Sequence, residues 1–276
     1  MQENEKINKI VSFLVDNYDL ESFELPSEYD YSCLPLCILD AIFSIGVKYK
    51  SVENVISRFC AKTGVLKYRD PSTEEYTVSA FCDYIDTTGV EAFENDILEN
   101  HQRTSSKNGI SKAEAVWQVA ELLRKNRIDT KADFNTKMNL ELEKQYKEIQ
   151  GQSSGISLNY LKMLAGSDDL VKPDRHIMKF LTDEYGFEIF KPCQAQPIID
   201  EVTKILKSEF PNISQRKVDY MIWNYMSANY KSPLHLFVDV GVILFFQCFI
   251  NLVEYQLVGI VAVISKNVYT AFFIVF

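Results

Sequence analysis

The amino-acid sequence predicts an all-α protein. Apolar residues recur at helical spacing along most of its 276 residues, as in 3–18, where one face is expected to carry Ile7, Ile10, Val11, Leu14 and Val15. The sequence shows no convincing strand alternation before residue 232 and no internal repeat. Polar capping residues stand at the beginnings of several periodic segments. These three observations favour helices packed against one another over the first 231 residues.

The remaining helices follow in order along the chain, separated by polar or acidic loops. The strongest is 111–126, in which Ser111 and Glu114 have the spacing of a capping box. Ser51 and Ser214 are expected to cap the helices that they begin. The other predicted helices are 36–44, 51–63, 77–88, a short one in 91–100, part of 130–148, 156–165, 175–185, 198–210 and 214–228.

Composition and cysteine spacing limit the classes of protein. About half of the residues are apolar, which is typical of a globular protein with ample core. The six cysteines have no paired metal-binding spacing, so buried free thiols and a reducing compartment are expected, with no metal site and no cofactor. The N-terminal residues lack the pattern of a secretory signal, and we therefore expect a cytoplasmic protein.

The net charge of −9 argues against nucleic-acid binding, because phosphate neutralisation normally supplies much of that affinity. Two local groups of basic residues remain. Lys172, Arg175 and Lys179 flank Asp174. The other group is interpreted either as a solvated helix face or as a basic patch, and consists of Arg103, Lys107, Lys112, Arg124, Lys125 and Arg127.

Residues 151–180 form the most informative segment. Gly151 and Gly155 suit a tight turn between helices, because glycine adopts positive φ at little cost. Gly166 follows the next helix as a stop signal, and the beginning of that helix is suited to binding a phosphate. Asp174 then stands where a helix cap is expected. An ordinary turn and an ordinary cap also explain these residues.

The chain resembles the helix-hairpin-helix DNA glycosylase superfamily of the endonuclease III type. The similarity covers roughly residues 34–225, and the order and spacing of the motifs carry it more than any single motif. The similar runs are Asp174-Arg-His176-Ile-Met-Lys179-Phe180, Ser111-Lys-Ala-Glu-Ala115, the hairpin 151–155 and the apolar helix from Cys37 to Ser44.

This resemblance implies a two-lobed helical fold and a function in base-excision repair. The barrel lobe would be 34–166, and the second lobe would combine 1–33 with 167–231. The resemblance makes Asp174 the catalytic carboxylate, acting on double-stranded DNA. It assigns DNA contacts to the residues of the hairpin, to those around Asp174 and to a duplex-wedging aromatic, namely Gly151, Ser153, Gly155, Lys172, Arg175, His176, Lys179 and Tyr49.

The sequence departs from the family pattern at three points. Ser153 stands where the second hairpin glycine is expected, and Gly155 occupies the position of the lysine in members that also cleave the strand. Without that amine, a monofunctional glycosylase is implied. The C-terminal third has only Cys193 and Cys248, so no iron–sulfur cluster is expected. The acidic net charge, the missing lysine and the altered second glycine also favour an alternative, a non-catalytic helical interaction protein that retains the scaffold. A membrane-tethered version of this alternative would use the C-terminal tail as its anchor.

Residues 232–276 differ in composition from the rest of the chain. They contain only three charged residues, Asp239, Glu254 and Lys266, and their longest largely apolar run is shorter than a bilayer-spanning helix requires. Three interpretations remain open: a membrane-associated element, a buried or oligomer-forming element, and a translated extension without a selected fold.

Overall fold

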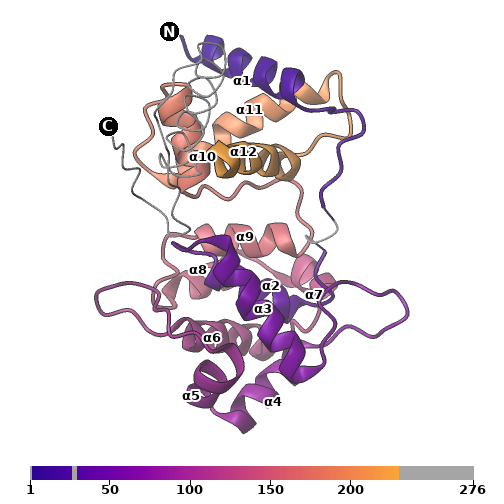
Figure 1. Cartoon of the computed structure of the whole chain (residues 1–276), viewed down its shortest axis with the longest axis vertical. Helices are drawn as coiled ribbons and strands as arrows, with labels where there is room; N and C mark the ends of the chain where they lie inside the picture. The colour runs from indigo at the N-terminus through magenta and orange to yellow at the C-terminus, as the bar shows by residue number, and fades with distance from the viewer. Residues whose placement is uncertain (1, 27–29, 230–276) are drawn as a thin grey trace, which may run out of the picture. The chain divides into compact units, whose positions relative to one another are not determined.

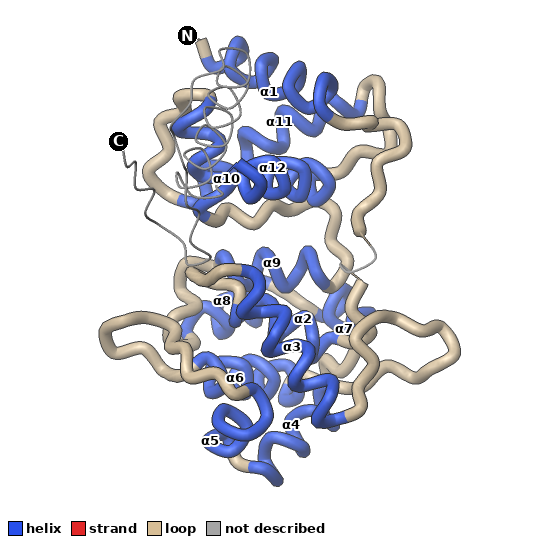
Figure 2. Tube along the Cα trace, in the orientation of Figure 1, coloured by secondary structure: helices blue, strands red, loops and turns tan. Residues whose placement is uncertain are grey.

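The computed structural model describes residues 2–26 and 30–229. Within these ranges the regular structure is helical, and two isolated bridges, Tyr31 with Tyr68 and Arg103 with Ser111, are the β pairing that occurs (Figure 2). The predicted all-α class is confirmed. Residues Met1–Met226 form one compact unit. The expectations for residues 232–276 lie outside the described residues.

Two buried apolar clusters organise this unit (Figure 1). The larger cluster lies among α2 (Leu34–Phe43), α3 (Tyr49–Thr63), α4 (Val78–Thr88), α5 (Val90–Ala92), η2 (Phe93–Leu98), α6 (Lys112–Lys125), α7 (Lys131–Lys137), α8 (Leu140–Glu148) and α9 (Ile156–Leu164). The second lies among α1 (Glu3–Asn17), α10 (Arg175–Lys179), η3 (Phe180–Glu184), α11 (Ala195–Lys207) and α12 (Gln215–Asn229). The short helix η4 (Pro192–Gln194) directly precedes α11.

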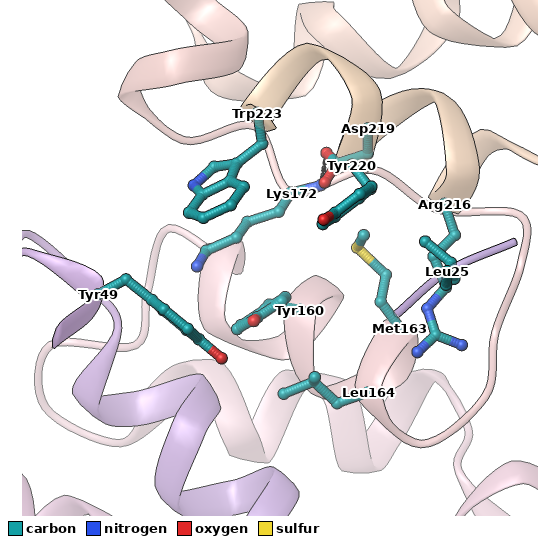
Figure 3. Close-up of a pocket in the computed structure, with 10 residues that line it drawn as sticks. All are labelled: Leu25, Tyr49, Tyr160, Met163, Leu164, Lys172, Arg216, Asp219, Tyr220 and Trp223. Carbon is teal, nitrogen blue, oxygen red and sulfur yellow. Dashed lines mark hydrogen bonds between the residues drawn. The ribbon is translucent and has the colours of Figure 1, made fainter. Parts of the chain in front are cut away.

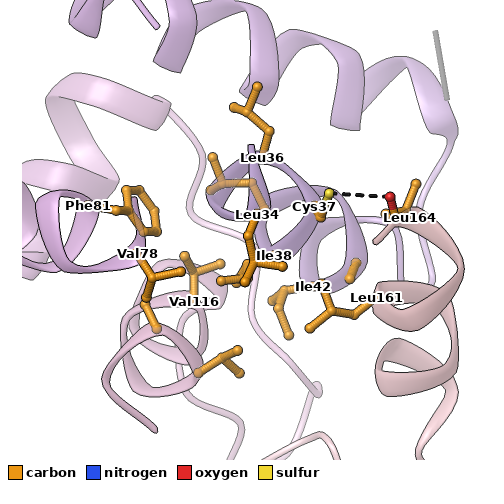
Figure 4. Close-up of a cluster of buried hydrophobic side chains, with 14 of the residues drawn as sticks. Leu34, Leu36, Cys37, Ile38, Ile42, Val78, Phe81, Val116, Leu161 and Leu164 are labelled. Atoms are coloured by element: carbon orange, nitrogen blue, oxygen red, sulfur yellow. Dashed lines mark hydrogen bonds between the residues drawn. The ribbon is translucent and has the colours of Figure 1, made fainter. Parts of the chain in front are cut away.

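Helix α2 is the centre of the larger cluster (Figure 4). All of its residues are buried, and it packs against α3, α6 and α9. Pro35 stands in its first turn, where a missing N–H costs nothing. Each fully buried leucine or isoleucine side chain stabilises the fold by about 1.5–3 kcal/mol. One residue breaks the apolar pattern, because Asp40 is as buried as its neighbours.

Helix beginnings follow the sequence in most places. Ser111 Oγ accepts the Glu114 N–H at 3.0 Å, and Ser214 Oγ accepts the Lys217 N–H at 3.2 Å. The predicted capping box is only half formed, since the Glu114 carboxylate accepts a hydrogen bond from Gln118. The prediction that Ser51 caps its helix was wrong. Helix α3 begins at Tyr49, and the Ser51 hydroxyl instead accepts a hydrogen bond from Gln102.

The predicted turn between helices joins α8 to α9. Gly151 has φ 88° and Gly155 has φ 73°, so both adopt the left-handed conformation that glycine tolerates. Gly151 also lacks room for a side chain, because a Cβ there would lie 2.3 Å from Thr104 Cβ. The predicted helix 175–185 forms as α10 followed directly by the π-helical turn η3.

Candidate functional site

Asp174 is the N-cap of α10. Its Oδ1 accepts the His176 N–H at 2.8 Å and the Ile177 N–H at 3.3 Å. Its own N–H donates to the carbonyl oxygen of Lys172 at 2.6 Å. Among the described residues, no hydrogen bond is recorded to the other carboxylate oxygen, Oδ2. The carboxylate is half-buried and is held in a fixed orientation by one of its oxygens.

Lys172 lies two residues before Asp174, and its side chain is directed into the protein. The ammonium donates to Ser44 Oγ at 3.0 Å and lies 3.6 Å from the centroid of the Tyr160 ring, a cation–π contact. The backbone N–H of Lys172 donates to Asp219 Oδ1 at 2.8 Å. Burial lowers the pKa of the Lys172 amine, while the charges of Asp174, Asp40 and Asp219 oppose that shift.

Two buried acids face this lysine from different helices. Burial raises the pKa of Asp219, on α12, to about 8, and the nearby charge of Asp174 adds to the shift. Burial raises the pKa of Asp40, on α2, to about 6, although the charge of Lys172 acts in the opposite direction. Asp40 Oδ2 accepts hydrogen bonds from the hydroxyls of Tyr31 at 3.0 Å and Tyr160 at 3.3 Å. At neutral pH, Asp219 therefore retains its proton more than Asp40 does.

An aromatic pocket surrounds the end of Lys172 (Figure 3). The ring centroids of Trp223 and Tyr49 lie 5.8 Å apart, and those of Trp223 and Tyr220 lie 6.2 Å apart in a stacked arrangement. The cavity has a volume of about 30 Å³, which is room for about one water molecule. Its lining consists of Leu25, Tyr49, Tyr160, Met163, Leu164, Lys172, Arg216, Asp219, Tyr220 and Trp223.

A wider depression adjoins this pocket and shares Leu25, Leu164 and Arg216 with it. Its volume is about 420 Å³, and its lining includes the basic side chains of Arg69, Lys131 and Arg216. Lys131 is paired there with Asp30 at 2.8 Å. Positive charge therefore lies beside the aromatic pocket, although the whole chain is acidic.

The residues that the sequence predicted to contact DNA lie partly around the aromatic pocket and α10, and partly in the α8–α9 connection. Lys172 and Tyr49 line the pocket, and His176 is adjacent to it, because its ring lies 6.4 Å from that of Trp223. Arg175 is exposed and Lys179 is half-buried, both on α10. The hairpin residues lie in the α8–α9 connection and do not line the pocket: Gly151 and Ser153 are exposed, and Gly155 is buried.

The basic residues between positions 103 and 127 do not form a continuous basic face. Lys112 is buried and donates to the carbonyl oxygens of Phe43 and Ile45, which closes the carboxyl end of α2. Arg124 is paired with Asp83, Asp86 and Glu121. The exposed members are Arg103, Lys107, Lys125 and Arg127.

Sequence reasoning missed Asp40, Asp219, Tyr160 and Trp223. For the two acids a signal was present, because each is a charged residue on an otherwise apolar helix face, and buried acids normally require partners. Tyr160 was assigned to the apolar face of its helix, and its hydroxyl contact with Asp40 depends on packing between α9 and α2.

Cysteines and metal-binding groups add no further site. The described cysteines carry free thiols, of which Cys33, Cys37 and Cys82 are buried. In residues 2–26 and 30–229, no three His, Cys, Asp or Glu side chains are arranged to hold a metal ion. No helix of these ranges combines the length and the apolar composition needed to cross a bilayer.

Comparisons with known proteins place the chain in a family without giving an activity. Residues 9–227, well over half of the chain, match a family described as a domain of unknown function, DUF8548. Neither the curated proteins nor the solved structures gave a match. The chain therefore belongs to the family defined by this domain of unknown function.

Proposed function

We propose that this protein is a monofunctional DNA N-glycosylase-like enzyme of base-excision repair, in which Asp174 is the catalytic carboxylate. The observation that supports this proposal is the position of Asp174 next to the aromatic pocket. Its charge acts on the pKa of two pocket residues, Lys172 and Asp219, and the helix that it caps places His176 against Trp223. A fixed carboxylate beside stacking side chains is suited to a flipped nucleotide.

In the proposed reaction, Asp174 acts on charge that develops in the transition state. As the N-glycosidic bond breaks, positive charge builds on the deoxyribose, and a carboxylate held in advance stabilises it. Oδ1 is held by the cap, so Oδ2 is the oxygen that we assign to this role. Asp174 also orients the attacking water. His176 supports the carboxylate as its neighbour on α10 and is not assigned the role of a base.

The pocket has to open before a base enters it. Its volume of about 30 Å³ is far smaller than a nucleobase, so Lys172, Tyr49 or Trp223 must rotate away. Opening the pocket adds to the few kcal/mol that extruding a nucleotide costs. Tyr49, at the beginning of α3, would then stack on DNA or on the extruded base.

The proposed function includes a two-lobed fold with a helix-hairpin-helix motif. The two buried clusters support a two-lobed glycosylase-like arrangement, with the barrel lobe at 34–166 and the second lobe at 167–231 joined by 1–33, except that Tyr31 and Cys33 pack in the larger cluster. The α8–α9 turn is the proposed helix-hairpin-helix motif. Gly151, Ser153 and Gly155 would approach the DNA phosphates there, while Lys172, Arg175, His176 and Lys179 contribute near Asp174.

Base release by the full chain tests this function. Wild type, Asp174→Asn and Asp183→Asn are compared on duplexes carrying alkylated, deaminated, oxidised or mismatched bases. Asparagine retains an oxygen that can cap α10, so the Asp174 variant should fold while losing activity by at least about 100-fold. Asp183 is exposed on η3, and its variant should match wild type. Equal activity of all three proteins would show that Asp174 is not catalytic.

A non-catalytic interaction protein is the second candidate. The observation in its favour is that Asp174 already makes the two hydrogen bonds of an ordinary helix cap. The acidic net charge is consistent with this alternative. Absence of base release on every duplex, together with absence of salt-sensitive DNA binding, would favour it over the enzyme.

A further inference from the structure

We propose that Lys172 is a nucleophilic amine that forms an imine with the aldehyde of an abasic deoxyribose. The inference rests on the proposed function, because an abasic site is what base release leaves behind. The sequence implied no such amine, since Gly155 occupies the position of the lysine that forms the imine in strand-cleaving members of the similar family. Lys172 is a different residue on a different segment, and the structure places its side chain in the pocket.

The backbone of Lys172 is fixed on both sides. Its N–H donates to Asp219 on α12, and its carbonyl oxygen accepts from the N–H of Asp174. The position of the lysine backbone is therefore coupled to the carboxylate that we assign to base release. From this anchor the side chain extends between Tyr49, Tyr160 and Trp223, with its nitrogen within the ring of aromatic side chains (Figure 3).

Burial of the nitrogen shifts its pKa in the direction that eases formation of the neutral amine, the form that attacks a carbonyl. The side chain is almost fully buried, and desolvation lowers its pKa, as in other reactive buried lysines. The charged or titratable groups near it are Asp174 and His176 close by in the sequence, Asp219, Tyr220 and Arg216 on α12, Asp40 on α2, Tyr160 on α9, Tyr49 on α3 and Lys112 on α6. Asp219 retains its proton at neutral pH, which reduces the negative charge that would keep the lysine protonated.

An incoming aldehyde can replace the contacts that the amine makes in the pocket. The nitrogen donates to the Ser44 hydroxyl and faces the Tyr160 ring, and Lys172 forms no ion pair within 4.0 Å among the described residues. A carbonyl carbon entering the pocket would replace a neutral hydroxyl contact, which costs far less than breaking a buried ion pair. The Tyr160 ring would then face the new C=N bond.

The reaction is a balanced condensation. The nitrogen lone pair of Lys172 attacks C1′ of the ring-opened sugar, so an N–C bond forms and the carbonyl π bond breaks. The resulting carbinolamine loses its oxygen as water, and both hydrogens of the neutral amine leave in that water. A C=N bond remains, and addition of water reverses the step. The product of base release would thus be held covalently until it is hydrolysed.

Reductive trapping tests the inference directly. The full chain is mixed with a duplex that already contains an abasic site, and borohydride reduces any imine to a stable amine. We expect a covalent protein–DNA product, with Lys172 as the attachment site in peptide mass spectrometry. Attachment at the N-terminal amine or at another lysine overturns the proposal, as does absence of trapping by the wild-type protein.

Matched variants add a second measurement. Lys172→Met retains the length and apolar stem of the side chain, and we expect trapping to fall by at least about tenfold because the nucleophile is gone. Lys204→Met removes an exposed lysine of α11 and should trap like wild type. If Lys172→Met fails to fold, the attachment site mapped by mass spectrometry on the wild-type protein still decides the question.

The two proposals fail in distinguishable ways. Trapping uses a preformed abasic site, whereas base release is measured separately, by alkaline cleavage of the DNA after incubation. Trapping at Lys172 without base release would sink the proposed function and leave the reactive amine in place. Base release that is lost in Asp174→Asn, without trapping in wild type, would support the function and overturn the inference.

Discussion

Asp219 shows how one buried side chain makes stability depend on pH. The acid lies on the apolar face of α12 and accepts the Lys172 N–H, while burial raises its pKa from 3.8 to about 8. The folded protein therefore retains this proton over a range in which the unfolded chain has lost it. The stabilising contribution is complete below pH 3.8 and is lost as the pH rises towards 8.

Asp219→Asn should remove this dependence, because an amide does not ionise and still offers an oxygen to the Lys172 N–H. We expect the difference in melting temperature, wild type minus variant, to fall steadily between pH 5 and pH 8. Thermal unfolding followed by circular dichroism measures it, with the exposed Asp183→Asn as control. A difference that stays constant over this range would contradict the raised pKa of Asp219.

At the scale of single elements, the α8–α9 turn depends on Gly151 for two separate reasons. Its φ of 88° is unfavourable for other residues, and an added Cβ would collide with Thr104 Cβ at 2.3 Å. Gly64 shares only the first reason, since its φ is 76° and nothing lies within 4 Å of an added Cβ. Comparing alanine variants of the two glycines therefore separates backbone strain from steric overlap.

Gly64→Ala should lower the free energy of unfolding by about 1–2 kcal/mol, the cost of a left-handed residue with a Cβ. Gly151→Ala should lower it by a further 1–3 kcal/mol or so, because Thr104 must also move. Urea denaturation of both variants against wild type gives these values. Equal losses would mean that the turn yields at Thr104 without cost.

Local signals in the sequence predicted the elements well and the site only in part. Helical periodicity and the caps Ser111 and Ser214 gave correct helices, because such signals act within one turn of the chain. The same rule misplaced the beginning of α3, where a partner 51 residues away, Gln102, binds the Ser51 hydroxyl. Asp40 and Asp219 were missed for the same reason, since the groups that contact them, the Tyr160 hydroxyl and the Lys172 N–H, lie far away in the sequence.

Lys172 shows the same limit of sequence patterns for a residue that the sequence did identify. The sequence placed it correctly beside Asp174 and predicted a DNA contact, which stays a prediction. Whether a lysine side chain points to solvent or to the interior depends on what packs around it, here Ser44 from the end of α2 and Tyr160 from α9. Segment-level patterns do not contain that information.

For the whole molecule, charge is the main constraint on DNA binding. The net charge is −9, and burial does not relieve it, because the buried charged residues of the described chain are three lysines, Lys112, Lys131 and Lys172, and two acids, Asp40 and Asp219. The surface is therefore acidic on average, and binding has to depend on local cations. Arg175 and Lys179 follow Asp174 on α10, and Arg69 and Arg216 line the adjoining depression.

This local basis predicts a measurable salt dependence. If Arg175 and Lys179 each neutralise a phosphate, Arg175→Gln and Lys179→Gln should each reduce the slope of log affinity against log salt concentration by about one. Fluorescence anisotropy of a labelled duplex, titrated at several salt concentrations, gives the slopes. Lys207→Gln, an exposed change on α11, should leave the slope unaltered. If all three variants share the wild-type slope, the DNA does not approach the protein over α10, and the assignment of Asp174 to catalysis loses its geometric basis.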